Sequence, residues 1–288
     1  MQNDKKEEPV VCFPVICLHE RRRAHRSLGN QLVCLLVHVG KLAEAEEAFR
    51  SLPYRNEFSW TSLISGHIKC GKLSRAFLLY HKMQEDSVQP SGHTFVSLIK
   101  ACIKLKDVEK AWSLHEDICK LGLQKDLFVG SALVDMYVRF DMVDKAEEVF
   151  EELLVRDVVS WNALISGFSR VGQGEKSLEL YRHMRCEGIS PTIVTFVCIL
   201  KACGNIGASE EGQKIHAEVS KEGLETDLIV ANTLIDMYGS LGLLTKAHEV
   251  FQKLPIRDVV SWTSCISVHV SEGMLSSRKH ILESLYSN

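Results

Sequence analysis

The sequence predicts an all-α fold, a solenoid of tandem helical hairpins. The first observation is a long internal period, because SWTSLISG, SWNALISG and SWTSCISV begin at Ser59, Ser160 and Ser261, a repeat of 101 residues. The second is an apolar spacing of i, i+3, i+4 and i+7, which is typical of one face of an α-helix. Self-similarity at a fixed period indicates a stacked array of repeats.

The composition is that of a globular chain with enough apolar surface for a core, since 45% of its 288 residues are hydrophobic and 25% are charged. No run of 18 apolar residues occurs, so no membrane span is predicted. Ten cysteines without a CxxC pair fit neither a zinc ribbon nor a disulfide scaffold. The net charge of −3 gives no general attraction to nucleic acid, so RNA binding requires basic residues on one face.

The chain divides into an N-terminal segment, 1–25, and units whose lengths repeat as 31, 35 and 35 residues. Segment 1–25 is expected to be irregular, because Pro14 interrupts its apolar stretch. Its acidic residues make it a poor transit peptide. The solenoid is expected over 26–288, in the units 26–56, 57–91, 92–126, 127–157, 158–192, 193–227, 228–258 and a partial unit 259–288.

Each unit is expected to hold two amphipathic helices. In unit 158–192 the two apolar stripes are Trp161, Leu164, Ile165 and Phe168, then Leu178, Tyr181 and Met184. Glycine, which suits the positive φ at a helix C-terminus, marks the break between helices at Gly40, Gly71, Gly172, Gly207, Gly242 and Gly273. Alanine, which lets paired helices approach closely, recurs in the second helix at Ala45, Ala76, Ala111, Ala146 and Ala247. Proline stops helices near unit ends at Pro53, Pro90, Pro191 and Pro255.

These features resemble the PLS class of pentatricopeptide-repeat proteins of plant organelles. The resemblance covers about residues 26–270 and rests on the alternating unit lengths and on the strings VVSWNALISG, LVDMY, LIDMY, KAEEVF and LIKAC. It implies a right-handed superhelix that binds single-stranded RNA, one base per repeat. Units 158–192, 193–227 and 228–258 resemble its P, L and S units. The tetratricopeptide repeat, a protein-binding hairpin, is the nearest competitor, but its unit length does not alternate.

In the family that the chain resembles, the fifth and the last residue of a unit read one base edge. The polar pairs that this implies are Asn30 with Asn56, Thr61 with Ser91, Ser131 with Asp157, Asn162 with Thr192, and Asn232 with Asp258. Units 92–126 and 193–227 carry Val96 with Asp126 and Val197 with Asp227, and are expected to leave their bases unread. The alternative for the aspartates is that they cap the next helix, which does not exclude base reading.

An ionised carboxylate only accepts hydrogen bonds, whereas amides and hydroxyls also donate. Ser131 with Asp157 therefore resembles a guanine reader, since guanine presents N1 and N2 donors. Asn232 with Asp258 resembles a uracil reader. The pairs of Asn30 and of Asn162 lean toward pyrimidines, and the predicted footprint is 5′-Y-N-N-G-Y-N-U-3′.

The second residues of six units are implied to pack on a base. These residues are Phe58, Phe128, Val159, Val194, Ile229 and Val260. Stacking of a base on an aromatic ring contributes about 1–3 kcal/mol. The alternative for Phe58 and Phe128 is a place in the core between repeats.

Four consecutive units carry a cation at their thirteenth residue, namely Lys69, Lys104, Arg139 and Arg170. Stacked units would align these side chains, and such a stripe binds phosphates whatever the net charge of the chain. The alternative is an ordinary solvated surface. We expect phosphate contact.

Catalytic motifs are missing from the sequence. His216-Ala217-Glu218 matches half of a zinc deaminase signature, but the P-C-x-x-C that completes the metal site does not occur. We therefore expect an ordinary helical His216, core thiols at Cys198 and Cys203, and no catalytic residue, metal or cofactor. The chain is not expected to be an enzyme.

The expected function is selection of RNA targets for organellar editing or processing, in a mitochondrion or a chloroplast as the resemblance implies. Editing-complex proteins would supply the deaminase in trans. The chain itself is expected to be a monomer that does not associate with a membrane. One alternative is a protein-binding scaffold of tetratricopeptide type. The other is a truncated, non-functional fragment, because the tail SSRKHILESLYSN resembles none of the family's extension domains.

Overall fold

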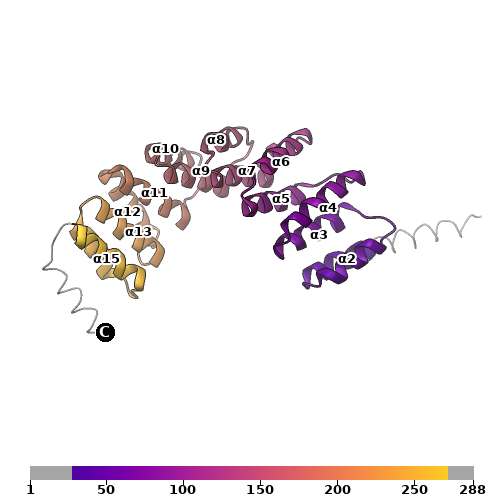
Figure 1. Ribbon diagram of the computed structural model, residues 1–288. Coiled ribbons are helices and arrows are strands. Elements are labelled where there is room, and N and C mark those ends of the chain that lie inside the picture. The colour runs from indigo at the N-terminus through magenta and orange to yellow at the C-terminus, as the bar shows by residue number, and fades with distance from the viewer. Residues whose placement is uncertain (1–27, 272–288) are drawn as a thin grey trace, which may run out of the picture. The chain divides into compact units, whose positions relative to one another are not determined.

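The computed structural model describes residues 28–271, and every regular element in that range is a helix (Figure 1). The all-α prediction is confirmed. Segment 1–25, Gly273 and the end of unit 259–288 lie outside the described residues. Residues 28–38 are helical, and the elements that follow are α2 Leu42–Ser51, α3 Glu57–Lys69, α4 Leu73–Glu85, α5 Gly92–Leu105, α6 Val108–Lys120, the 3-10 turn η1 Leu123–Lys125, α7 Leu127–Arg139, α8 Val143–Glu151, α9 Val158–Arg170, α10 Gly174–Cys186, α11 Ile193–Ile206, α12 Ser209–Lys221, α13 Leu228–Ser240, α14 Leu244–Lys253 and α15 Val259–Ser271.

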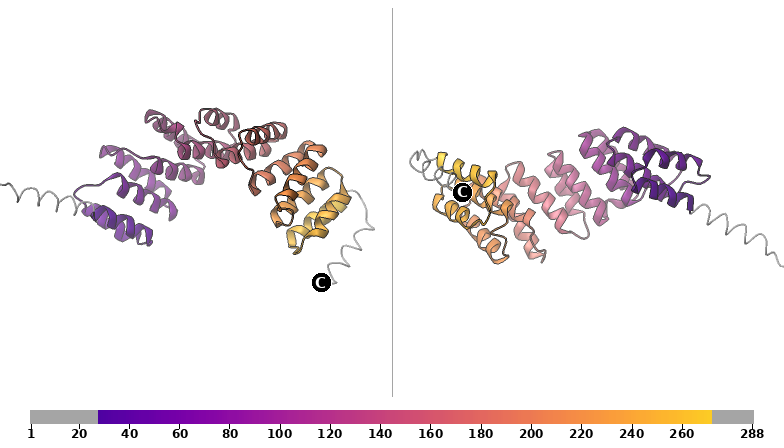
Figure 2. Two further views of the ribbon diagram at one scale, coloured as in Figure 1. Left: turned by 180° about the vertical axis from the view of Figure 1, so that it is seen from behind. Right: turned by 90° about the horizontal axis from the view of Figure 1, so that it is seen from below.

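The chain forms two compact lobes, Met1–Leu114 and His115–Asn288, with the boundary inside α6. In the N-terminal lobe α3 packs on α4 and on α5. In the C-terminal lobe the first helices of successive units pack side by side, α7 on α9, α9 on α11, α11 on α13 and α13 on α15 (Figure 2). Each of these first helices begins at the first residue of an expected unit. None of the described helices has the length and apolar composition of a membrane span.

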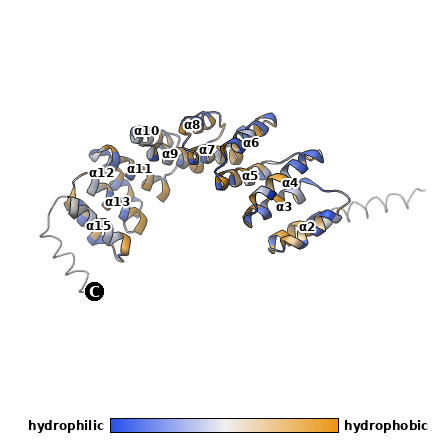
Figure 3. Cartoon of the chain, viewed as in Figure 1, coloured by the Kyte–Doolittle hydropathy of each residue, from blue (hydrophilic) through white to orange (hydrophobic). Residues whose placement is uncertain are grey.

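The apolar stripes of these helices form the core of each lobe, and individual helices accordingly show both hydrophobic and hydrophilic stretches (Figure 3). In unit 158–192, Leu164, Ile165 and Phe168 are completely buried and Trp161 is 2% exposed. The recurrent alanines of the second helices, Ala45, Ala76, Ala111, Ala146 and Ala247, are at most 2% exposed. Methyl side chains at these positions let the paired helices pack closely.

A three-residue cluster of phenylalanine, arginine and tryptophan recurs in the core with the period of 101. The rings of Phe150 and Trp161 meet edge to face at 4.7 Å, and the guanidinium of Arg156 lies 4.9 Å from the Phe150 ring. The same cluster forms from Phe49, Arg55 and Trp60 and from Phe251, Arg257 and Trp262. In each, the arginine Nε also donates to the phenylalanine carbonyl oxygen. Of these three residues, only the tryptophan had been recognised as periodic from the sequence.

The 31-residue units differ from the 35-residue units in their second helix. Helices α2, α8 and α14 have 10, 9 and 10 residues, whereas α4, α6, α10 and α12 have 13. The difference is about one helical turn. The recurrent arginine of the cluster follows each shortened helix, and it donates to carbonyls that the end of the helix leaves without an intrahelical partner.

The break between the two helices of a unit requires a left-handed backbone. Gly172 has a φ of +83°, which glycine adopts without steric cost. Two units lack glycine there, and Lys106 and Asp141 adopt φ values of 54° and 59° instead. The turn is therefore set by the hairpin and tolerates a side chain.

Candidate nucleic-acid interface

The last residue of each unit directly precedes the first helix of the next unit and caps its N-terminus. The Asp157 carboxylate accepts from the Ser160 N–H over 2.8 Å, and the Asn56 side chain accepts from Ser59 N–H over 3.0 Å. Asp126, Asp227 and Asp258 cap α7, α13 and α15 in the same way. Helix capping, proposed above as the alternative for the aspartates, is therefore real. It fixes the position of each of these side chains.

The fifth residue of a unit lies against the last residue in the C-terminal lobe. The Ser131 hydroxyl donates to Asp157 Oδ1 over 3.1 Å, although the residues are 26 positions apart. The amide of Asn162 donates to the Thr192 hydroxyl, also over 3.1 Å. The structure thus brings together the members of two residue pairs, each of which was predicted to read one base.

Asn232 and Asp258 form the third such pair in this lobe. Hydrogen bonds from the Ser261 N–H, from the Ser261 hydroxyl and from Asn232 lower the pKa of Asp258. Asn232 is 8% exposed, and its Oδ1 has no hydrogen-bond partner among the described residues. An unsatisfied buried acceptor is costly. A donor that reaches this buried oxygen would satisfy it.

The pairs of the N-terminal lobe are arranged differently. Asn30 Oδ1 accepts from the backbone N–H of Asn56 over 3.2 Å, and Asn30 is only 4% exposed. Thr61 and Ser91 do not bond each other, since both donate to the Glu57 carboxylate. Glu57, the first residue of its unit, was missed by the sequence analysis. Its spacing of four residues from Thr61 was the available signal.

A buried threonine supports two of the pairs. Thr195 donates to Asn162 Oδ1 over 2.6 Å, and Thr94 lies 2.6 Å from the Thr61 hydroxyl. Both threonines are completely buried, and both begin the string TFV in a 35-residue unit. They hold the reading residues in one orientation and were also missed.

The second residues of the units all point to solvent. Phe58 and Phe128 are 70% exposed, so the alternative of a place in the core between repeats is wrong. Val159, Val194, Ile229 and Val260 are exposed as well. Phe58 also lines a cavity of about 590 Å³ together with Asn30 and Asn56. The base-reading pair of unit 26–56 and the base-packing residue of the next unit, 57–91, therefore share one open space.

The four expected phosphate contacts are exposed but not equally free. Arg139 pairs with Asp135 over 2.8 Å, and Arg170 pairs with Asp141 over 2.9 Å. Lys69 and Lys104, in the N-terminal lobe, have no ion pair within residues 28–271. The aspartate partners lower the positive potential at the two arginines.

The residues of the half deaminase motif are engaged within the protein. His216 Nδ1 lies 2.7 Å from the Tyr238 hydroxyl and Nε2 lies 3.2 Å from Glu225. Burial lowers the pKa of His216 and raises that of Tyr238 to about 12. Cys203 is buried and Cys198 half-buried. Among the described residues, no group of three or more His, Cys, Asp or Glu side chains is placed to hold a metal.

Two family models match the chain. The model described as "PPR repeat family" matches residues 55–104 and 156–205, and the model described as "PPR repeat" matches 93–123, 131–158 and 229–259. PPR stands for pentatricopeptide repeat. Together the matches cover more than half of the chain.

Similar proteins of Arabidopsis thaliana carry the same repeat in their names. Pentatricopeptide repeat-containing protein At3g24000, mitochondrial, is 35% identical over 246 residues, which are 85% of this chain and 39% of that protein. Pentatricopeptide repeat-containing protein At1g15510, chloroplastic, is 34% identical over 241 residues, 83% of this chain and 28% of that protein. The chain thus spans well under half the length of these relatives.

Solved structures share the fold. The PPR10 protein in complex with an 18-nt psaJ RNA element matches with a TM-score of 0.75 and 17% identity, covering 98% of this chain and 44% of that one. The PPR domain of Arabidopsis thaliana protein-only RNase P 1 in complex with tRNA matches with a TM-score of 0.51 and 20% identity, covering 66% of this chain and 98% of that domain.

Proposed function

The chain belongs to the pentatricopeptide repeat family, and from this premise we propose that it binds single-stranded RNA with one base per repeat unit. It acts as a monomer of the PLS class in a mitochondrion or a chloroplast. It selects sites for RNA editing or processing, and proteins of an editing complex supply catalysis in trans. The RNA-bound structures of PPR10 and of the RNase P domain support the RNA-binding part of this proposal.

The observation that carries the proposal is the pairing of fifth and last residues in three units of the C-terminal lobe. Ser131 with Asp157, and Asn162 with Thr192, present two adjacent polar side chains at the start of a first helix. The capping bond uses Asp157 Oδ1, so the second carboxylate oxygen remains to accept from a base. Exposed Val159 lies two residues further on and offers an apolar contact for the base ring.

The four cations supply phosphate contacts of unequal strength. We infer that Lys69 and Lys104 bind the RNA backbone directly, whereas Arg139 and Arg170 must exchange an aspartate for a phosphate. When RNA binds at these arginines, a phosphate takes the place of the aspartate as the anionic partner. The gain in binding free energy per contact is smaller at the arginines for that reason.

Selection from a random pool of RNA tests the proposed function. The full chain is immobilised, bound RNA is recovered over several rounds, and the enriched sequences are aligned. The proposal expects a guanine three positions after the leading pyrimidine and a uracil three positions after that guanine. Enrichment without any base preference at those two positions would contradict the assignment of Ser131 with Asp157 and of Asn232 with Asp258.

A further inference from the structure

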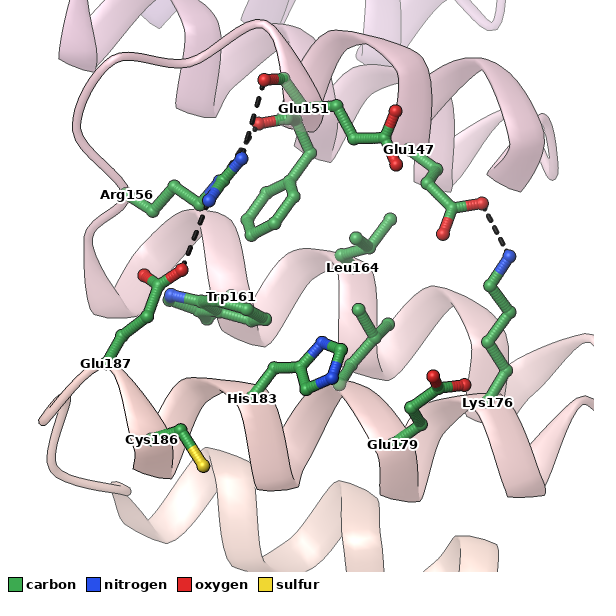
Figure 4. Close-up of a pocket in the computed structure, with 12 residues that line it drawn as sticks. Glu147, Glu151, Arg156, Trp161, Leu164, Lys176, Glu179, His183, Cys186 and Glu187 are labelled. Atoms are coloured by element: carbon green, nitrogen blue, oxygen red, sulfur yellow. Dashed lines mark hydrogen bonds and ion pairs between the residues drawn. The ribbon is translucent and has the colours of Figure 1, made fainter.

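An open cavity of about 520 Å³ lies beside the shortened helix α8, between α8, α9 and α10 (Figure 4). We call it the α8 notch. Its floor is apolar and is formed by Phe150, Trp161, Leu164 and Leu180. The remaining lining residues are mostly charged, namely Glu147, Glu151, Arg156, Lys176, Glu179, His183, Cys186 and Glu187.

The notch results from the length of α8. This helix ends at Glu151 after 9 residues, whereas α10 beside it has 13 residues. The missing turn leaves a cavity above the floor at the end of α8, and the floor side chains themselves are at most 8% exposed. The phenylalanine and tryptophan of the recurrent cluster therefore lie under an open space.

The charges on the rim do not balance. Lys176 pairs with Glu147 over 2.6 Å, and Arg156 pairs with Glu187 over 3.1 Å. The other two carboxylates, Glu151 and Glu179, are exposed and have no ion pair within the part of the chain that the structure describes. Four carboxylates thus face two permanent cations, and the notch carries a negative potential.

The floor also contains an unsatisfied donor. Trp161 is 2% exposed, and its Nε1 has no hydrogen-bond partner among residues 28–271. The indole nitrogen lies at the end of the ring toward Glu187, at the border of the notch (Figure 4). An unpaired buried N–H is unfavourable, and an acceptor that enters from the rim would relieve it.

The N-terminal lobe contains the same positions 101 residues earlier with other charges. Arg50 stands in place of Glu151, Leu78 in place of Glu179, and Lys82 in place of His183. The carboxylates of that set are Glu46, Glu85 and Asp86, and its cations are Arg50, Arg55, Arg75 and Lys82. The repeat keeps the floor, including buried Trp60, but reverses the sign of the rim.

We propose that the α8 notch is a docking site for a partner protein, which inserts a short segment with a lysine or arginine next to an apolar side chain. The cation pairs with the unpaired rim carboxylates of Glu151 and Glu179, the apolar side chain fills the cavity above the Phe150 and Trp161 rings, and a backbone carbonyl of the segment accepts from the indole N–H. A phosphate backbone is repelled by the same carboxylates. This function goes beyond RNA binding and adds a protein contact.

The notch and the base-reading residues occupy different sides of α9. Successive residues of an α-helix are rotated by about 100°, so Asn162 points roughly 160° away from Leu164. Asn162 bonds Thr192 toward α11, whereas Leu164 faces α8 and α10. RNA and the partner segment therefore bind at the same time.

The test uses the full chain labelled with 5-fluorotryptophan, whose four tryptophans give four fluorine resonances. Trp161→Phe and Trp60→Phe assign the two signals of interest. The probes are the peptides acetyl-Leu-Arg-Leu-amide and acetyl-Leu-Glu-Leu-amide. We expect the arginine peptide to shift the Trp161 resonance in a saturable way, with no shift at Trp60 and at least tenfold weaker binding of the glutamate peptide.

Two reciprocal variants serve as matched controls. Glu151→Arg with Glu179→Leu installs the rim of the N-terminal lobe and is expected to abolish the Trp161 response. Arg50→Glu with Leu78→Glu installs the α8 rim and is expected to create a response at Trp60. Both variants change exposed residues, so circular dichroism should show unchanged helix content.

Three results would overturn the proposal. They are an unshifted Trp161 resonance with the arginine peptide, equal binding of both peptides, and displacement of the peptide by saturating RNA. The last result would assign the notch to RNA. None of them affects base selection by Ser131 and Asp157, which the random-pool experiment measures separately.

Discussion

Ser131 and Asp157, at opposite ends of one repeat unit, share a hydrogen bond of 3.1 Å, and the same carboxylate oxygen caps the helix that begins the next unit. One side chain therefore joins two units and presents a free acceptor beside a hydroxyl. Helix capping and base reading are compatible because a carboxylate accepts several hydrogen bonds. The cap fixes the geometry that reading requires.

Ser131→Asn tests the base read by unit 127–157. The longer amide side chain gives this pair the residues of Asn232 with Asp258, which resembles a uracil reader. We expect the preference at this one base to move from guanine toward uracil, while the other positions keep theirs. Fluorescence anisotropy with RNAs that differ only at that base measures the change. An unchanged order of affinities would remove the case for a code at this unit.

Because only two of the four cations are in ion pairs within the described part of the chain, we expect the four to contribute unequally to RNA affinity. Lys104→Gln should reduce RNA affinity and lower the slope of log K against log salt by about 0.7, the value for one phosphate contact on a single strand. Arg139→Gln should reduce the affinity and the salt slope by less, because Asp135 already forms an ion pair with the arginine. Titrations of one RNA at several salt concentrations measure both quantities.

Asp135→Asn is the matched gain-of-function variant for the same prediction. It frees Arg139 without removing a cation, so RNA should bind more tightly and the salt slope should steepen. Weaker binding by this variant would show that the Arg139 side chain does not meet phosphate.

Phe128→Ala and Trp161→Ala separate binding from stability. Phe128 is 70% exposed, so its loss should leave the free energy of unfolding within about 0.5 kcal/mol. The same change should weaken RNA binding by about 1–3 kcal/mol if a base stacks on the ring. Trp161 is buried against Phe150, and its truncation should lower the free energy of unfolding by about 3–5 kcal/mol.

Urea denaturation and RNA titration of both variants check this pair of predictions. A large loss of stability in Phe128→Ala would place the ring in the core after all. Unchanged RNA affinity of that variant would remove its role as a base-packing residue.

Two half-buried histidines predict destabilisation by acid. Burial lowers the pKa of His115 and of His216 below the usual 6.5, and each ring bonds a tyrosine hydroxyl of the following helix. The unfolded chain therefore binds more protons below pH 6.5, so the free energy of unfolding falls as pH drops through that value toward the lowered pKa. Above pH 6.5 these groups contribute no pH dependence.

The double variant His115→Gln with His216→Gln removes these titrations. Urea midpoints at pH 7.5 and pH 5.0 should differ less in the variant than in the unaltered chain. Glu225, Lys253 and Lys246 surround His216 and remain present in both proteins. An equal drop in both proteins would assign the acid sensitivity to other groups.

The sequence was sufficient for the fold class and for the residues at which helices begin, because both follow from period and apolar spacing. The resemblance also predicted three polar pairs that meet in the C-terminal lobe, whereas Thr61 and Ser91 both bond Glu57 instead of each other. Helix capping by Asp157 was an open alternative, and the structure shows it. Thr195 recurs with Thr94 at the period of 101, but only the structure shows that both contact reading residues, whereas Glu57 has no equivalent 101 residues later.

Most contacts between side chains of different helices could not be predicted from the sequence. Arg139 and Asp135 are four residues apart on one helix, so their pairing could have been found, whereas Arg170 with Asp141 depends on the turn between helices. The arginines of the recurrent cluster do share the period of 101, but only the structure shows that they cover phenylalanine rings. The α8 notch likewise depends on one missing helical turn.

The most direct measurement of the central claim compares Asp157→Asn with Asp227→Asn by selection from random RNA. Both aspartates cap a helix and asparagine caps equally well, so stability should not change in either variant. Asp157→Asn replaces the free acceptor with a donor, and the base at that position should change from guanine to adenine, whose N1 accepts. Asp227 is the last residue of a unit whose fifth residue is Val197, and that unit is expected to leave its base unread. Asp227→Asn should therefore leave the selected sequence unchanged. The same selected sequence for both variants would contradict the reading of bases by paired fifth and last residues.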